Sequence, residues 1–363
     1  MASRIVVFGA TGYTGELIAS RLAAAGARPV LAGRSESKLS ALAERLGGLD
    51  WVRADALRQN TVFDLVGPDD VLISTVGPFV KWGLPAARAA VAAGCTYIDT
   101  TGEPEFIRTL FEELDGPARR SGARVIPSLS YEFAGGVLAG ALALDEAGGD
   151  AVRVDVGYYA LGGGPNSLSA GTRESLVGIV LGDHFAYRDG AVRGVRAAER
   201  VRSFVVAGKS REAFSLGALE HYALRGSSDS LREVNVYTGW FGPLSRAVQA
   251  GSVVGTVVQR VPLVRPGMKW WGERAVSLVG GPEAGTTPEG VRSWIAAEAL
   301  SESGDVLARV DLAGTDGYDF TASLVAWAAQ RRVDGAGVLG PVEAFGLEAL
   351  EDAALSAGLE RVQ

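Results

Sequence analysis

The sequence predicts an α/β protein of two parts: a Rossmann-type doubly wound parallel sheet, then an α+β domain with a largely antiparallel sheet. The first observation behind this is an apolar run, Ile5 to Phe8, that opens into a glycine-rich turn and a helical pattern. The second is an alternation of apolar strands and helices up to about residue 149. The third is the change beyond that point to successive strands without helices between them. A length of 363 residues also fits two domains better than one.

Residues 4–15 predict a turn that binds a diphosphate. The spacing of Gly9, Gly12 and Gly15 is G-x-x-G-x-x-G. It differs from the common G-x-G-x-x-G motif, but both are typical of dinucleotide-binding turns. Backbone N–H groups can approach a diphosphate where the turn has no Cβ atoms, and the helix N-terminus adds a favourable dipole. We expect cofactor contacts from Gly9, Thr11, Gly12, Tyr13, Thr14 and Gly15.

The first domain is predicted over residues 1–149. Its strands are apolar throughout, as in a parallel sheet covered on both faces, and right-handed crossovers then give the doubly wound arrangement. The predicted strands are 4–8, 29–32, 51–54, 71–76, 96–99 and 124–127, with helices at 37–46, 84–93 and 103–120.

The second domain is predicted over residues 150–335, with a role in substrate binding or oligomerisation. Residues 152–159 alternate apolar and polar side chains, and a helix is expected at 318–331. Further strands are expected at 200–206, 233–240, 274–280, 294–300 and 306–312. The last segment, residues 336–363, contains a helix near 347–357 and is expected to pack back on the Rossmann domain.

Composition narrows the class of protein. Hydrophobic residues make up 47% and charged residues 21%, which indicates a globular chain. A net charge of −7 argues against nucleic acid or an anionic membrane as a partner. The single cysteine, Cys95, excludes an internal disulfide. We expect no signal peptide, because the N-terminal residues lack a charged segment followed by an apolar one. We also expect no membrane span, because the longest apolar stretch, near 137–144, is too short. The expectation is a cytoplasmic protein with a small-molecule substrate, and a homodimer is possible.

The end of the second strand favours NADP over NAD. An NAD site usually places Asp or Glu there to bind the ribose hydroxyls, and here an acid comes only later, at Glu36. Arg34 can pair with a 2′-phosphate, Ser35 can donate its hydroxyl, and Lys38 follows at the helix start. The alternative is that Arg34 caps a surface loop. Asp55, after the third strand, is either an acceptor for the adenine amino group or a solvated acid.

The end of the fourth strand is expected to border the ribose and nicotinamide, because ligands of open α/β sheets lie over the carboxyl ends of the strands. Gly77 permits close approach, Pro78 stiffens the turn, and Phe79 is expected to pack on the ring; Thr75 and Val76 precede them. The alternative is a plain turn chosen for its φ angles.

Several of these motifs resemble a known family. The segments 9–15, 32–35 and 75–79, and Asp99-Thr100-Thr101-Gly102-Glu103, occur in the order found in saccharopine dehydrogenase-like reductases. Within that family they are similar to the trans-acting enoyl reductase branch, and weaker likeness continues through 167–172, 317–319 and 344–346. The resemblance implies a Rossmann domain, an inserted α+β domain, and NAD(P)-dependent reduction of C=N or C=C bonds. One departure is Ser130-Tyr131-Glu132-Phe133-Ala134-Gly135, where that branch commonly has Gly-Phe-Asp-Ser-x-Pro.

Candidate catalytic residues lie at the strand ends near the nicotinamide. No Tyr-x-x-x-Lys motif and no G-x-S-x-G elbow is present. No zinc-ligand pattern is present either, and we therefore expect no metal. Tyr131 is a candidate donor of a proton or hydrogen bond, and Glu132 either pairs with a substrate amine or caps the following helix. Thr100, Thr101 and Glu103 are expected to line the pocket, although Glu103 is also explained as a charge at a helix N-terminus.

The second domain is rich in aromatic residues. Tyr237 and Trp240 are expected to wall an apolar pocket for an acyl or polyketide-like substrate, with core or subunit interface as the alternatives. The glycine-rich segment 161–167 is either a loop that closes over substrate or a surface turn.

These observations rank three functions. The first is NADPH-dependent reduction of a conjugated C=C bond in a fairly apolar metabolite. The second is an imine or iminium reductase, or an amine dehydrogenase acting in reverse, which an acid such as Glu132 favours. The third is a non-catalytic NADP-binding sensor or partner subunit, motivated by the lack of an obvious proton donor.

Overall fold

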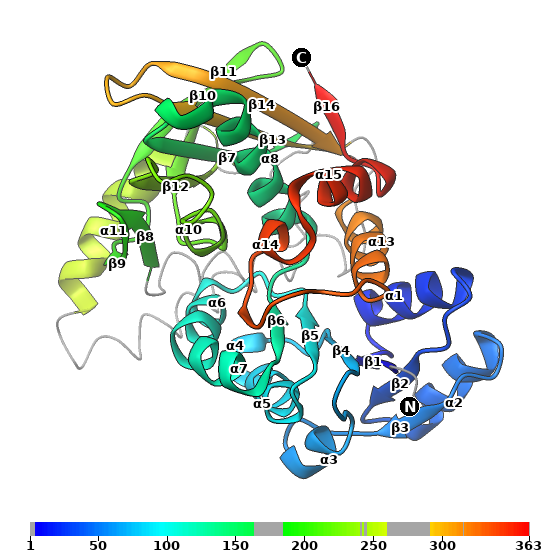
Figure 1. The fold of residues 1–363 in the computed structure, drawn as a ribbon. Helices are drawn as coiled ribbons and strands as arrows, with labels where there is room; N and C mark the ends of the chain where they lie inside the picture. The colour runs from blue at the N-terminus through cyan, green and yellow to red at the C-terminus, as the bar shows by residue number, and fades with distance from the viewer. Residues whose placement is uncertain are drawn as a thin grey trace. The chain divides into compact units, whose positions relative to one another are not determined.

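The structure is a computed structural model that describes residues 4–162, 184–239, 242, 245–259, 291–314 and 316–362. Its internal contacts divide the chain into two units, residues 1–134 with 317–357, and residues 135–316 with 358–363. Figure 1 labels the helices and strands of both.

The first unit is built on a parallel sheet. The described residues give seven strands in the order β15-β6-β5-β4-β1-β2-β3, which is the Rossmann order with one added edge strand. These strands are β1 (Ile5–Phe8), β2 (Val30–Gly33), β3 (Trp51–Arg53), β4 (Val71–Ser74), β5 (Thr96–Asp99), β6 (Arg124–Ile126) and β15 (Gly337–Val338). The predicted doubly wound sheet is confirmed. The two-residue strand β15 is too short to leave a pattern in the sequence.

Helices surround this sheet (Figure 1). They are α1 (Tyr13–Ala24), α2 (Glu36–Arg45), α3 (Gln59–Phe63), α4 (Phe79–Trp82), α5 (Leu84–Ala93), α6 (Pro104–Thr109), α7 (Asp115–Ser121), α13 (Gly317–Ala328), α14 (Pro341–Phe345) and α15 (Leu347–Ser356). Helix α1 turns Ile18 and Leu22 into the core, and both are fully buried. The predicted helix 103–120 is α6 and α7 joined by a π-helical turn, η1 (Leu110–Leu114).

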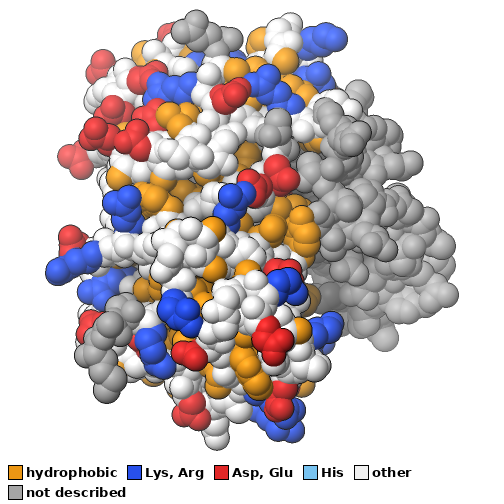
Figure 2. Space-filling model, turned by 90° about the vertical axis from the view of Figure 1, so that its right-hand side faces the viewer, with side chains coloured by type: hydrophobic (Ala, Val, Ile, Leu, Met, Phe, Trp, Pro, Cys, Tyr) orange, Lys and Arg blue, Asp and Glu red, His pale blue; other side chains and the backbone are white. Residues whose placement is uncertain are grey.

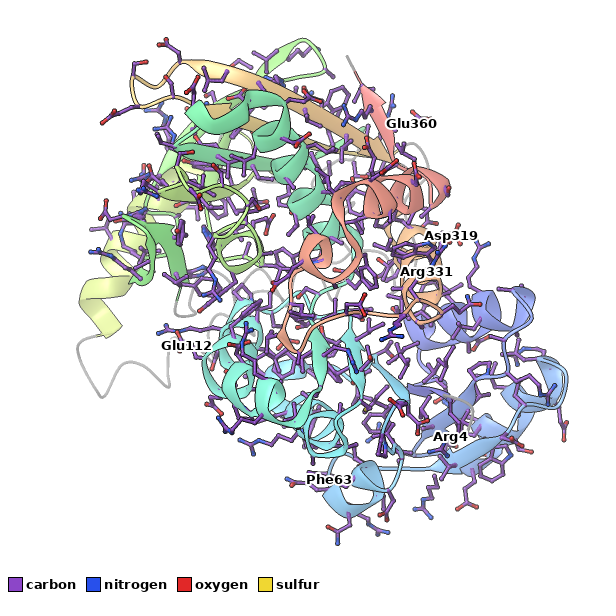
Figure 3. The ribbon with its side chains drawn as sticks, viewed as in Figure 1. Arg4, Phe63, Glu112, Asp319, Arg331 and Glu360 are labelled. Atoms are coloured by element: carbon purple, nitrogen blue, oxygen red, sulfur yellow. The ribbon has the colours of Figure 1, made fainter. Side chains whose placement is uncertain are left out.

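Helix α13 belongs to the first unit because it packs along α1. An ion pair joins Arg21 of α1 to Asp319 of α13, and Asp319 is labelled in Figure 3. The Tyr13 and Tyr318 rings meet edge to face, with centroids 5.1 Å apart. The predicted boundaries at 149 and 335 therefore differ from the observed units, since no local pattern marks a helix that returns across nearly two hundred residues.

The second unit is built on a mixed, mostly antiparallel sheet. Its main path runs β10-β11-β12-β7-β13-β14-β16, and β8 and β9 branch from β12. The strands are β7 (Arg153–Leu161), β8 (His184–Arg188), β9 (Ala191–Val195), β10 (Val201–Val206), β11 (Lys209–Ser215), β12 (Glu233–Thr238), β13 (Arg292–Leu300), β14 (Val306–Gly314) and β16 (Glu360–Val362). The predicted antiparallel character is confirmed. The exception is the parallel pair β7 and β12, which are far apart in the sequence and leave no local signal of pairing.

The central strand β7 has two differently covered faces. Val156 and Tyr158 face α8 (Tyr131–Ala147), whose Gly136 and Gly140 leave room for them. Asp155 and Tyr159, which alternate with these residues, face the hairpin of β10 and β11. The described part of this unit also contains the short helix α10 (Glu220–Ala223), the longer helix α11 (Ser245–Gln259) and the 3₁₀ turn η2 (Gly148–Asp150) before β7.

Candidate functional site

The glycine turn after β1 has the shape that a diphosphate needs. Gly9 has φ +93°, a left-handed conformation, and an added Cβ would lie 2.6 Å from Thr75 Oγ1. A Cβ on Gly15 would collide with the Gly9 carbonyl oxygen, so this glycine lets α1 pack closely on the turn. A Cβ on Gly12 would meet only the Gly9 oxygen, at 3.3 Å. Helix α1 begins at Gly12 without a side-chain cap, so its N-terminus is left for an anion.

Thr75 ties the end of β4 to this turn. Its hydroxyl donates to the Phe8 carbonyl at 3.3 Å and to the Gly9 carbonyl at 3.2 Å. Thr11, in the glycine turn, lies near the end of β2. Its hydroxyl is 3.8 Å from the position that a Cβ on Gly33 would take. The structure thus brings Gly9–Gly15, Thr75 and the end of β2 together, as the sequence predicted for one nucleotide site.

The end of β2 carries cationic side chains next to the turn. Arg34 and Lys38 are exposed, and Arg34 forms no ion pair with the carboxylates of the described part. Ser35 is the N-cap residue of α2. Glu36, the nearest acid, pairs with Arg53 at 3.3 Å. The Arg34 guanidinium is thus available for a 2′-phosphate, and the Glu36 carboxylate already has a cationic partner in Arg53.

Asp55 has a local partner. Its Oδ1 accepts the Leu57 N–H at 3.0 Å, and its own N–H donates to Thr61 Oγ1 at 3.0 Å. The side chain is half-buried in the turn after β3. A contact from Asp55 to adenine therefore stays a prediction.

The loop after β4 is held by a carboxylate from the next loop. Glu103 accepts the N–H of Phe79 at 2.6 Å and that of Val80 at 2.9 Å. The Phe79 ring is 7% exposed and packs on Phe106, with centroids 5.6 Å apart. Val76, Gly77 and Pro78 lie at the surface of the loop between β4 and α4, partly or fully exposed. Stacking of Phe79 on nicotinamide stays a prediction.

The loop after β5 is anchored by a buried acid that the sequence interpretation did not select. Asp99 is fully buried, and its Oδ1 accepts the N–H of Thr101 at 3.0 Å and that of Ser128 at 2.8 Å. Burial raises the pKa of the Asp99 carboxyl to about 6, although these hydrogen bonds lower it. Thr101 is also fully buried, and Thr100 is half-buried.

Glu132 lies at the start of α8, beside this loop. A Cβ on Gly102 would sit 3.2 Å from Glu132 Oε2, so the carboxyl lies against the glycine. Within the described part of the chain, the Glu132 side chain has no hydrogen-bond or ion-pair partner. Burial raises the pKa of this carboxyl above its usual range. The Glu132 carboxyl therefore holds its proton more firmly than an exposed glutamate does.

Tyr131 is fixed by α13. Its N–H donates to Thr321 Oγ1 at 3.0 Å, and its ring meets Phe320 edge to face at 5.5 Å. Gly317 lies beside the Tyr131 side chain, where an added Cβ would make an ordinary contact at 3.5 Å. The start of α8 is therefore held in place next to the loop that carries Gly102.

Other predicted site residues lie elsewhere. Tyr237 is 3% exposed in the core of the second unit, in one cluster with Tyr159 and Phe204. Trp240 lies outside the described residues, as do 163–167 of the glycine-rich segment and the predicted strand 274–280. Among the described residues no group of three His, Cys, Asp or Glu side chains could hold a metal ion. No described helix has the length and apolar character to cross a membrane.

Two groups with a structural link to the site were missed from the sequence. Asp99 was read only as part of a family motif, although an Asp two residues before Thr101 is the pattern of a side chain that bonds backbone ahead of it. Arg53 is the last residue of β3 and pairs with Glu36 at the start of α2. Figure 2 shows acidic and basic side chains interspersed on the face that it presents.

The sheet order, the glycine turn and the exposed Arg34 together define a dinucleotide-binding domain of the Rossmann type.

Comparison with known proteins specifies this domain. Residues 5–125 match the family described as saccharopine dehydrogenase NADP binding domain. A candidate trans-acting enoyl reductase of Mycobacterium tuberculosis is 40% identical over 134 residues, covering 35% of this chain and 32% of that protein. The trans-acting enoyl reductase of Mycobacterium ulcerans is 38% identical over 134 residues, with the same coverage. The apo saccharopine dehydrogenase (L-Glu forming) of Saccharomyces cerevisiae superposes with a TM-score of 0.59 and 12% identity over 100% of both chains.

These matches confirm three predictions. Residues 5–125 match an NADP-binding domain of the saccharopine dehydrogenase type, the cofactor is NADP, and the resemblance to trans-acting enoyl reductases holds in this part of the chain. The structural likeness confirms the fold class. The aligned segment covers about a third of the length of these curated relatives.

Proposed function

We propose that this protein is an NADPH-dependent oxidoreductase that reduces a conjugated C=C bond of a fairly apolar metabolite. The NADP-binding domain and the names of the relatives support this class of reaction. The observation that carries the proposal is the Glu132 carboxyl, which lies against Gly102 beyond the carboxyl ends of β5 and β6. Ligands of open α/β sheets lie at that edge.

The roles of the residues follow from their positions. NADPH supplies a hydride when bound, and the glycine turn and Arg34 would hold its diphosphate and 2′-phosphate. Glu132, whose pKa burial raises, would deliver the proton that balances the hydride. Tyr131, packed on Phe320, would orient the start of α8 and is the second candidate for that proton.

A second reaction is supported by the same carboxyl. An ionised Glu132 would stabilise a cationic C=N carbon, as an imine or iminium reductase requires. The saccharopine dehydrogenase type of the domain is consistent with this alternative. A non-catalytic NADP-binding sensor is the alternative of another class. Cytoplasmic location, a small-molecule substrate and a homodimer remain predictions.

Consumption of NADPH with two probes separates these functions. An enoyl thioester of N-acetylcysteamine should be reduced faster than a cyclic imine of similar size. Faster reduction of the imine would favour the second reaction. Stable NADPH binding without turnover of any enoyl or imine probe would favour the sensor.

Replacing Glu132 by Gln tests its role. We expect Glu132→Gln to lower kcat by about a hundredfold or more, the usual contribution of a positioned acid, with NADPH affinity kept. Glu146→Gln, at the exposed far end of α8, is the matched control. Tyr131→Phe completes the set, and a larger loss there than in Glu132→Gln would make Tyr131 the proton donor.

Arg34 can be tested without a substrate. Arg34→Ala should weaken NADPH binding by about ten- to a hundredfold, because a charge-assisted pair with the 2′-phosphate is lost. NADH binding should change little, since NADH lacks that phosphate. Fluorescence titration of both cofactors measures the two effects, and an equal loss for both would rule out Arg34 as the 2′-phosphate ligand.

A further inference from the structure

Glu103 joins two loops at the carboxyl edge of the parallel sheet. It lies at the start of α6, yet its two carboxylate oxygens accept the N–H groups of Phe79 and Val80, at 2.6 and 2.9 Å. Phe79 directly follows Gly77 and Pro78 in the loop after β4. The carboxylate therefore bonds the first turn of α4, where the loop after β4 ends, and not the N-terminus of its own helix.

A series of hydrogen bonds leads from Glu103 to the interior. The Glu103 N–H donates to Thr101 Oγ1 at 3.1 Å, and the Thr101 N–H donates to Asp99 Oδ1 at 3.0 Å. The Ser128 N–H donates to the same oxygen at 2.8 Å. Asp99, Thr101 and Ser128 are fully buried. Asp99 thus joins the loops after β5 and β6, and Glu103 joins the loop after β5 to the segment after β4.

What Glu103 fixes is backbone. The Phe79 ring is buried against Phe106, so the two N–H bonds hold the main chain of residues 77–80 while the side chain anchors it below. Hydrogen bonds to a charged acceptor are worth more than neutral ones, so this contact holds the loop more firmly than a plain turn. In a Rossmann sheet this loop borders the nicotinamide half of the dinucleotide.

We propose that Glu103 is a positioning residue for the nicotinamide half of NADP, with Asp99 as the buried anchor of the same hydrogen-bond series. This inference rests on the proposed position of the nicotinamide at the end of β4. It does not depend on which substrate is reduced. It replaces the expectation that Glu103 lines the substrate pocket.

The test compares two ligands that differ only in the nicotinamide, NADPH and 2′-phospho-ADP-ribose. Glu103→Ala should weaken NADPH binding about tenfold, equivalent to one charge-assisted hydrogen bond, and leave the affinity for 2′-phospho-ADP-ribose unchanged. Glu103→Gln keeps one acceptor oxygen and should lose about threefold for NADPH. Glu105→Ala is the control, because this exposed carboxylate lies on the same helix and has no side-chain hydrogen bond or ion pair to the described residues.

The results distinguish a failure of the positioning role of Glu103 from a failure of the proposed function. An equal loss for both ligands in the folded Gln variant, or no loss in either Glu103 variant, would overturn the positioning role. Equal affinity of the unaltered protein for the two ligands would overturn it together with the proposed nicotinamide position. Loss of reductase activity with every probe would affect only the proposed function, since both ligands bind without a substrate.

Discussion

The carboxyl edge of the first unit and the β10–β11 side of the second unit bury acids in opposite ways. In the first, Asp99 and Glu103 accept backbone N–H groups, and neither forms an ion pair with the described residues. In the second, Asp155 and Glu298 both pair with Arg202, and Arg309 also pairs with Glu298. Desolvation raises the pKa of both Asp99 and Asp155, but only Asp155 has a guanidinium that opposes it.

In the first unit the acids hold loops in place, and in the second unit they hold strands together. A carboxylate bonded to N–H groups fixes main chain at the end of a sheet and takes up no cation. A carboxylate bonded to arginine joins β7 and β13 to the hairpin that lies over them, and its cation is taken up in the process. We therefore expect the two regions to differ in what a single substitution does.

The largest effect is expected at Arg202. Arg202→Met would remove the shared cation from two buried acids, which leaves Asp155 with Arg153 and Glu298 with Arg309. We expect it to lower the free energy of unfolding by about 3–5 kcal/mol. Chemical denaturation measures the loss. The control is Arg246→Met, which breaks a pair with Glu212 while its own side chain is 77% exposed, and should cost at most about 1 kcal/mol. Similar losses in the two variants would mean that the buried network does not hold the hairpin.

The second largest loss of stability is expected at Asp99, and its size depends on the residue that replaces the acid. Asp99→Ala leaves two buried N–H groups without an acceptor, which should cost about 2–4 kcal/mol of unfolding free energy. Asp99→Asn keeps an oxygen in place of Oδ1, which accepts both bonds, so most of that stability should remain. If Asn proves as harmful as Ala, the charge of Asp99 matters, and the contrast with the arginine network fails.

Local patterns in the sequence were enough for the Rossmann sheet and the glycine turn, because strand, turn and helix follow one another within a dozen residues. They predicted the helix α13 but not its packing on α1, and they did not predict β15 or β16, because these elements join their partners after a long return of the chain. Within the site, Arg34 and Glu132 could be chosen by type and place at a strand end. The bonds of Glu103 to another loop could not, since they depend on the tertiary path of two loops.

The smallest effect concerns an acid in the second unit that pairs with no arginine among the residues the structure describes. Glu220 is fully buried and accepts the Tyr158 hydroxyl, and burial raises the pKa of its carboxyl to about 8 from 4.5. A pKa raised on folding adds stability that is complete below pH 4.5 and is lost as the pH rises through about 8. Glu220→Gln keeps an acceptor for Tyr158 and cannot ionise. Its unfolding free energy should exceed that of the unaltered protein increasingly toward pH 8, by about 1–3 kcal/mol.

The neighbouring His221 sets the range in which this measurement is clean. Burial lowers the pKa of His221 to about 4 from 6.5, so its contribution is present above pH 6.5 and is lost only as the pH falls below it. Between pH 6.5 and 8, a falling stability therefore reports Glu220 and not His221. A parallel pH dependence in Glu220→Gln and the unaltered protein would show that Glu220 is ionised in the folded state. The Tyr158 hydroxyl alone would then have to stabilise a buried charge, and the contrast between acids held by arginine and acids held by neutral donors would lose its energetic basis.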